Sequence, residues 1–188
     1  MRKSSPPINS SNYESFLLFA EIASALWVHI IAFETTLRNF IHQSLSHAYG
    51  SSKWWLTEKL LTSKDFDDIR KVQERLENKG NSTKDSLIIS NLSLSFWVEL
   101  LSKRYHQKIW KRLLKYFPTD PGRREEFHRK AREIRRLRNS IAHHGPILRR
   151  NLIRDHAYLH ELTAILDPIL ADAIQKRSRV LDLLLNAR

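Results

Sequence analysis

The chain has 188 residues, of which 41% are hydrophobic, and this suits one globular domain rather than a disordered chain. It has no cysteine, which excludes disulfides and thiolate metal sites and fits a reducing cytoplasm. With 32 basic and 20 acidic residues the formal net charge is +12, so we expect a polyanionic partner, with nucleic acid ahead of an anionic membrane.

The first predicted element is a long helix. Residues 1–12 are polar and are expected to form a flexible lead-in to a single domain over residues 13–188. Over 13–46 apolar residues recur at helical spacing. The run 16–33 has the length of a membrane span, but it contains Glu21, and a charge near a bilayer centre costs at least about 2.5 kcal/mol. We therefore expect a buried amphipathic helix, no membrane partner and a cytoplasmic location.

Shorter helical elements are expected in the middle of the chain. Trp54-Trp55 fall in a short helical turn, and a helix follows over 63–78. Thr62 and Asp65 resemble a capping box at its start. The tryptophans in these segments are expected in the core or an interface more than as base-stacking residues; they are Trp54, Trp55, Trp97 and Trp110.

Further helices are expected in the second half of the chain. Residues 79–91 are polar and read as a loop, whereas 92–117 are helical with a bend. Asp120-Pro121 is a favourable helix start, so a helix is expected over 121–144, ending at Gly145-Pro146. Residues 149–186 are helical again, with a break at Pro168. Without alternating strand patterns, the sequence predicts an all-α fold of five or six helices.

Candidate functional groups concentrate at 135–148. Since each helical residue advances by about 100°, Arg138 lies on the flank of the buried face and His144 nearer that face. Asn139 and His143, four residues apart, share a stripe that points away from the core. This stripe must meet solvent, a substrate or a second subunit.

These residue types suit phosphodiester chemistry. Imidazoles exchange protons near neutral pH, and an arginine can hold a phosphate through two donors and stabilise charge on its oxygens. With Asn139 as an orienting group, His143 and Arg138 fit attack of a ribose 2′-hydroxyl on its own phosphodiester, a reaction that needs no metal. A twofold dimer would double these groups around one cleft. The structural alternative is that the Arg and His side chains only complement the dipole and last carbonyls of a helix end.

The same residues resemble a known family. Arg138 to His143 match the R-N-x-x-x-H motif of the HEPN superfamily, and IRRLRNSIAHHGPI (134–147) is similar to the signature of its Abi-like, or abortive-infection, branch. FETTLRNFIH (33–42), WW (54–55) and LSFWVELLSKRYHQKIW (94–110) resemble other segments of that branch. The resemblance covers roughly residues 20–185. One departure is Gly145, where the branch usually has a glutamate that could orient His144 or His143.

The resemblance implies a HEPN-like helical bundle that dimerises around the motif helix, so that two motifs face one cleft. Members typically act as metal-independent endoribonucleases in phage defence or toxin–antitoxin systems and leave 2′,3′-cyclic phosphate and 5′-hydroxyl ends. Carried over by residue, His143 is the acid/base, Arg138 the phosphate ligand and Asn139 the polar helper. His144, Glu34 and Arg38 are expected to support the site. Glu34 could pair with Arg38 on its own helix or with Arg138 across the cleft.

Basic residues crowd the motif helix and are the RNA-binding candidates; they are Arg129, Lys130, Arg132, Arg135 and Arg136. A solvated basic face is the alternative. His156 and His160 have a metal-compatible spacing but no third ligand, so an exposed helix face is preferred there. No metal or cofactor is expected.

The predicted function is an endoribonuclease acting as a homodimer on RNA, with an antitoxin protein or an inhibitory RNA as a candidate partner. Two alternatives stay open. One is a HEPN module that binds RNA or a nucleotide without cutting it, and the other is a regulatory partner in a toxin–antitoxin system.

Overall fold

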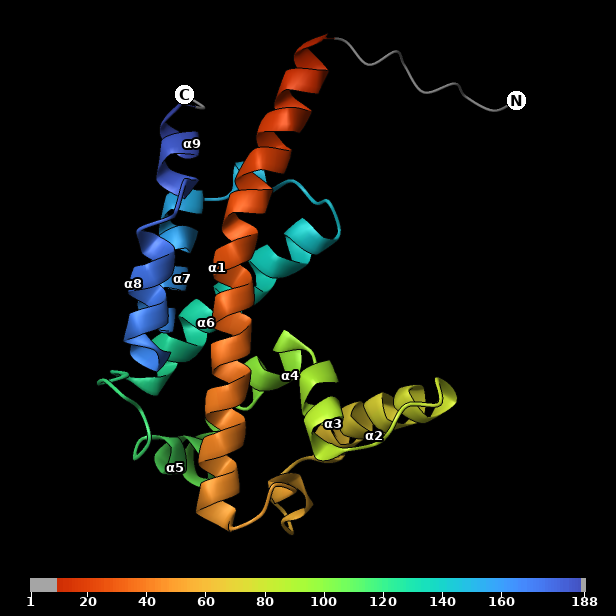
Figure 1. Ribbon diagram of the computed structural model, residues 1–188. Helices are drawn as coiled ribbons and strands as arrows, with labels where there is room; N and C mark the ends of the chain where they lie inside the picture. The colour runs from red at the N-terminus through yellow and green to blue at the C-terminus, as the bar shows by residue number, and fades with distance from the viewer. Residues whose placement is uncertain (1–9, 187–188) are drawn as a thin grey trace.

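The computed structural model describes residues 10–186, and all the regular structure in this range is helical (Figure 1). Helix accounts for 76% of the protein, which confirms the all-α prediction. The α-helices are α1 (Ser10–Tyr49), α2 (Ser63–Asn78), α3 (Asp85–Asn91), α4 (Leu94–Glu99), α5 (Lys111–Leu113), α6 (Arg124–Ala142), α7 (Leu152–Leu166), α8 (Pro168–Gln175) and α9 (Val180–Asn186). Short 3₁₀ turns lie at Trp54–Leu56, Lys103–Tyr105 and Ile147–Arg149, and a π-helical turn lies at His106–Trp110.

Helix α1 is the axis of the fold. Helices α7, α8 and α9 lie along its N-terminal half, α6 crosses it near the middle, and α2 and α3 extend to one side near its other end (Figure 1). Its fully buried residues recur three and four apart, which is the pattern that predicted the helix; they include Leu26, Ile30, Phe33, Leu37 and Ile41. The helix begins at Ser10, three residues earlier than predicted, and the rest of the expected lead-in (1–9) lies outside the described residues.

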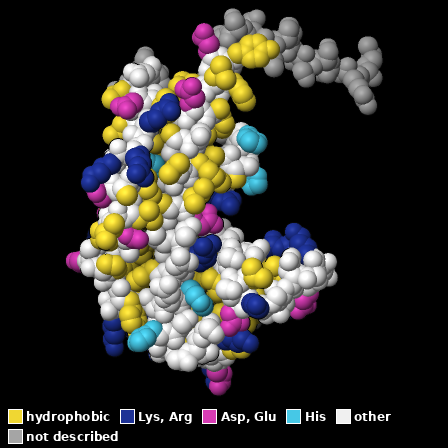
Figure 2. Space-filling view, viewed as in Figure 1, with side chains coloured by type: hydrophobic (Ala, Val, Ile, Leu, Met, Phe, Trp, Pro, Cys, Tyr) yellow, Lys and Arg dark blue, Asp and Glu magenta, His cyan; other side chains and the backbone are white. Residues whose placement is uncertain are grey.

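One face of α1 is exposed and apolar. Phe16, Leu17, Val28 and Ile31 are each at least half exposed, and hydrophobic side chains follow the helix on the surface (Figure 2). By length and composition Tyr13–Tyr49 could cross a membrane, since its most apolar window has a mean hydropathy of 2.0 with 39% of its residues buried. Core helices of soluble proteins meet the same criterion. The cytoplasmic location therefore stays a prediction.

Two predictions for the middle of the chain are wrong. The expected loop 79–91 contains α3, whose Ile88 and Ile89 are buried. The expected bent helix 92–117 is divided into α4, a 3₁₀ turn, a π-helical turn and α5, because Ser102 adopts an extended backbone conformation that interrupts the helix. This part of the chain consequently has more and shorter helices than predicted, and residues 10–186 contain more helices than the five or six expected.

The start of α6 also differs from the prediction. The backbone N–H of Gly122 donates to Asp120 Oδ1 at 2.9 Å, and Gly122 has a φ of +64°. A left-handed residue cannot continue a right-handed helix, so this turn replaces the expected cap and α6 begins at Arg124.

Helix α2 matches its predicted bounds and has the predicted capping box of Thr62 and Asp65. The Asp65 carboxylate is buried and also accepts a hydrogen bond from the hydroxyl of Tyr105. Burial and this hydrogen bond raise the pKa of Tyr105, so the phenol stays protonated as a donor. The contact ties the start of α2 to the turns that follow α4.

Replacing Tyr105 with phenylalanine is expected to lower the free energy of unfolding by about 1 to 3 kcal/mol, because a buried carboxylate loses a donor. Urea unfolding followed by circular dichroism measures the change. Tyr116→Phe is the control, since the Tyr116 hydroxyl makes no hydrogen bond within residues 10–186. Equal losses in the two variants would contradict the assigned role of the Tyr105 hydroxyl.

Candidate functional site

The motif lies where α6 ends. Ala142 is the last helical residue, and His143 is the C-cap, with its N–H donating to the Asn139 carbonyl at 3.1 Å. His144 follows with a φ of +54° and donates to Ile141 at 3.1 Å, and the Gly145 N–H donates to Ser140 at 2.7 Å. This is the Schellman pattern of helix termination. The predicted continuation of the helix to residue 144 is therefore wrong.

The same turn corrects the placement of His144. A left-handed residue takes the chain off the helix axis, so His144 is exposed rather than close to the buried face. Glycine is the usual residue at this position, and histidine is among the few others that are enriched there. His144 therefore forms part of the turn that holds His143 at the end of the helix.

Gly145 lies tightly against this helix end. A Cβ atom at residue 145 would be 3.3 Å from the Ser140 carbonyl oxygen, which is closer than ordinary van der Waals contact. A glutamate at residue 145, as in the resembling branch, would thus require the turn to shift. In this protein the turn is adapted to glycine.

Arg138 lies between α6 and α1 and is partly exposed. Its buried Nε atom forms an ion pair with Glu34 Oε2 of α1 at 3.6 Å and makes no hydrogen bond within residues 10–186. Its guanidinium carbon lies over the ring of Trp27, 5.9 Å from the ring centroid, at the outer limit of a cation–π contact. The terminal nitrogens make no hydrogen bond within residues 10–186, and the side chain is 32% exposed. This leaves the two-donor edge that recognises a phosphate available.

Glu34 pairs with Arg138 of α6 and not with Arg38 of its own helix. The Nε atom of Arg38 instead donates to Asn39 Oδ1 at 3.3 Å. Of the two pairings that the sequence left open, the structure contains the one between helices. The supporting residue Glu34 thus lies at the motif, while Arg38 lies one turn farther along α1.

Asn139 and His143 are exposed, as their shared helical stripe predicted. Neither side chain makes a hydrogen bond to another residue in the range 10–186. Both are free to meet a substrate or a second protein chain. One copy of the protein therefore presents a single Arg138 guanidinium, with His143 at the end of the same helix.

The basic residues of α6 fall into two groups. Three of the RNA-binding candidates form ion pairs within the protein: Arg129 with Glu126, Lys130 with Glu161, and Arg136 with Glu133. Hydrogen bonding from Arg129 lowers the pKa of Glu126 to about 2. Arg132 and Arg135 have no salt-bridge partner among residues 10–186, so their charge is available to another molecule.

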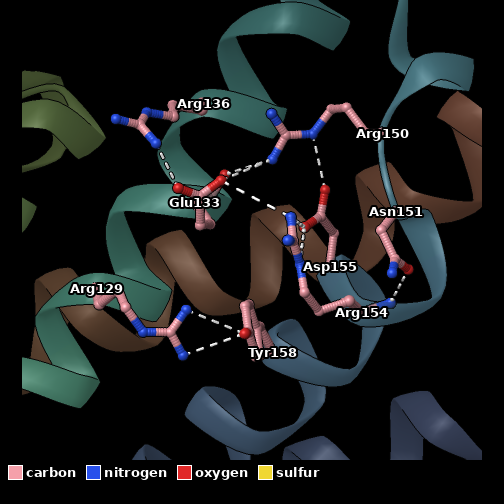
Figure 3. A network of polar contacts seen from close by, with 8 residues as sticks. All are labelled: Arg129, Glu133, Arg136, Arg150, Asn151, Arg154, Asp155 and Tyr158. Atoms are coloured by element: carbon pink, nitrogen blue, oxygen red, sulfur yellow. Dashed lines mark hydrogen bonds and ion pairs between the residues drawn. The ribbon is translucent and has the colours of Figure 1, made fainter.

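A polar network that was not predicted from the sequence connects α6 with the segment that follows the motif (Figure 3). Asp155 of α7 is fully buried and accepts hydrogen bonds from Arg150 at 2.7 Å and Arg154 at 3.0 Å. Arg150 also reaches Glu133 of α6 at 3.3 Å. The network ties the segment that follows the Gly145 turn back onto the motif helix. Its only signal in the sequence is an acidic residue among closely spaced arginines.

A second missed cluster lies between α1, α7 and the turn before α9. The Ser178 hydroxyl makes hydrogen bonds with His29 Nε2 at 2.9 Å and His156 Nε2 at 3.2 Å. Burial, together with smaller effects of the nearby His156 and His160, lowers the pKa of His29 to about 4. His156 is only 3% exposed, so the expectation of an exposed face is wrong for this residue.

The four tryptophans weighed in the sequence are all buried, which confirms their interpretation as core residues; they are Trp54, Trp55, Trp97 and Trp110.

The chain was compared with known proteins in three ways. No protein-family model matches it. No curated protein and no solved structure matches it either.

Proposed function

We propose that this protein is a metal-independent endoribonuclease of the HEPN type, resembling the Abi-like branch, that acts as a homodimer. The observation that carries the proposal is the state of Arg138. Its guanidinium lies 3.6 Å from Glu34 Oε2, its terminal nitrogens make no hydrogen bond within residues 10–186, and His143 lies at the end of the same helix. An arginine with two free donors and an exposed imidazole can supply the phosphate ligand and the acid/base that cleavage through the ribose 2′-hydroxyl requires.

In the proposed reaction His143 of one copy removes the proton from a ribose 2′-hydroxyl. The 2′-oxygen attacks the adjacent phosphorus, and the bond from phosphorus to the 5′-oxygen breaks. His143 of the second copy gives a proton to the departing 5′-oxygen. The two Arg138 side chains bind the nonbridging oxygens, whose negative charge grows in the transition state. The products carry a 2′,3′-cyclic phosphate and a 5′-hydroxyl.

Two copies are needed because one chain presents Arg138 and His143 only once. A twofold axis beside the end of α6 would supply the second imidazole and the second guanidinium. Arg132 and Arg135 would contact flanking phosphates, while Asn139 would orient the imidazole or a phosphate oxygen. We further propose a cytoplasmic role in phage defence or a toxin–antitoxin system, restrained by an antitoxin protein or an inhibitory RNA.

The test is incubation of mixed RNA with wild-type protein and His143→Ala in the presence of EDTA. Wild type should cleave and leave cyclic phosphate ends, and His143→Ala should be slower by a factor of about 10² to 10⁴. His47→Ala is the matched control, because His47 is also exposed but lies near the far end of α1. Equal activity of wild type and His143→Ala would contradict the mechanism.

A non-cleaving RNA-binding module is the second candidate. It is favoured by the lack of any carboxylate at residue 145 and of any side chain hydrogen-bonded to His143 within residues 10–186. Binding of RNA without cleavage by wild type and His143→Ala alike would support this candidate over the first. If neither protein binds RNA even at low salt, a regulatory role with a protein partner replaces both.

A further inference from the structure

Trp27 differs from the other four tryptophans of this protein. Those four have exposed fractions of 3% or less, whereas Trp27 is partly exposed. It lies on α1 beside Arg138, the residue at the centre of the proposed site. One indole is thus partly exposed next to the cation whose terminal nitrogens are open to a phosphate.

Trp27 packs in part against the hydrophobic core and keeps the rest of its ring exposed. The Arg138 guanidinium lies over the ring at 5.9 Å from its centroid, which is the outer limit of a cation–π contact. Val28 and Ile31, next to Trp27 and one turn along, are 57% and 50% exposed. The site therefore combines a phosphate ligand with an apolar surface on one side of it.

We propose that Trp27 is the platform on which the base next to the scissile phosphate stacks. This inference rests on the proposed ribonuclease function and adds the determinant of substrate recognition at the same site. A phosphate held by Arg138 carries a base within a few bond lengths, and the indole is the nearest aromatic surface to that cation. Stacking on an aromatic side chain accepts every base, so Trp27 favours unpaired nucleotides rather than a particular sequence.

The competing explanation is that Trp27 only orients Arg138. The two explanations differ in what they require of the ligand. A stacking platform acts through the base and is useless to a ligand without one. An orienting residue acts through the phosphate and affects ligands with and without bases equally.

The test compares two uncleavable single strands, a short oligodeoxyuridine and an abasic deoxyribose phosphate strand of the same length. Fluorescence polarisation gives the affinity of wild type, Trp27→Leu and Trp27→Phe for each strand. Trp27→Leu should bind the base-containing strand about five- to a hundredfold more weakly than wild type. It should bind the abasic strand as wild type does, and Trp27→Phe should recover part of the loss.

Tyr49→Leu is the matched control, because Tyr49 is a partly exposed aromatic residue of α1 with an arginine, Arg112, 5.0 Å from its ring. It should bind both strands as wild type does. Equal weakening of both strands by Trp27→Leu, or no weakening of either, overturns the stacking role. RNA cleavage by wild type is measured in parallel. If wild type cleaves RNA but Trp27→Leu weakens both strands equally or neither, only the role of Trp27 is contradicted. If wild type neither cleaves nor binds RNA, the proposed function is contradicted as well.

Discussion

Replacing Arg138 with lysine is expected to lower the rate of RNA cleavage by a factor of about 10² to 10³, although the charge is kept. The guanidinium uses Nε toward Glu34 and keeps its two terminal nitrogens for a phosphate. An ammonium group has a single nitrogen, so it cannot remain near Glu34 and also present two parallel donors. Single-turnover cleavage rates measure the effect on the chemical step.

Arg112→Lys is the control for this substitution, since the Arg112 guanidinium also lies beside an aromatic ring, that of Tyr49, at 5.0 Å. Its rate should equal that of wild type. If Arg138→Lys retained full activity, Arg138 would be acting as a general positive charge and the two-donor geometry would play no part.

Acidification is expected to destabilise the protein, and His29 should make the largest contribution from a single histidine. Its folded-state pKa, about 4, is below the unfolded value of 6.5, so the unfolded chain binds the proton more readily. Stability is therefore complete above about pH 6.5 and is lost as the pH falls toward about 4. For His29 alone the loss approaches about 3 kcal/mol of the free energy of unfolding.

Urea unfolding at a series of pH values tests this expectation. His29→Gln keeps a polar group next to Ser178 but cannot titrate, so its stability should depend less steeply on pH than that of wild type. Some dependence should persist, because burial also lowers the pKa of His42, His128 and His156. His47→Gln, at an exposed site, should leave the slope unchanged. If the free energy of unfolding of His29→Gln depended on pH as steeply as that of wild type, the assigned contribution of His29 would be contradicted.

Local patterns in the sequence predicted the elements that depend on local physics. The apolar spacing of α1 and the Thr62–Asp65 capping box of α2 are complete within their own segments, and both are present in the structure. The outward stripe of Asn139 and His143 follows in the same way from helix geometry. These features need no information about the rest of the chain.

Features that depend on distant residues could not be predicted in this way. The buried His156 makes a hydrogen bond with Ser178, 22 residues later in the chain. Arg138 of α6 forms an ion pair with Glu34 of α1. Periodicity within one segment cannot show such partners. The break at Ser102 and the left-handed turn at His144 could not be predicted for a related reason. The local sequence permits other backbone conformations at both residues.

The ion pairs around α6 have a consequence for the thermodynamics of binding a polyanion. An arginine already bound to Glu126, Glu133 or Asp155 has exchanged its mobile counterions for a fixed carboxylate. When it meets a phosphate it has few ions to release, and the carboxylate that it leaves has to be hydrated again. Among the basic residues of α6 named here, the entropy of ion release, which drives most association with nucleic acid, must therefore come mainly from Arg132 and Arg135. The formal net charge of +12 therefore does not show which basic residues are available to contact RNA.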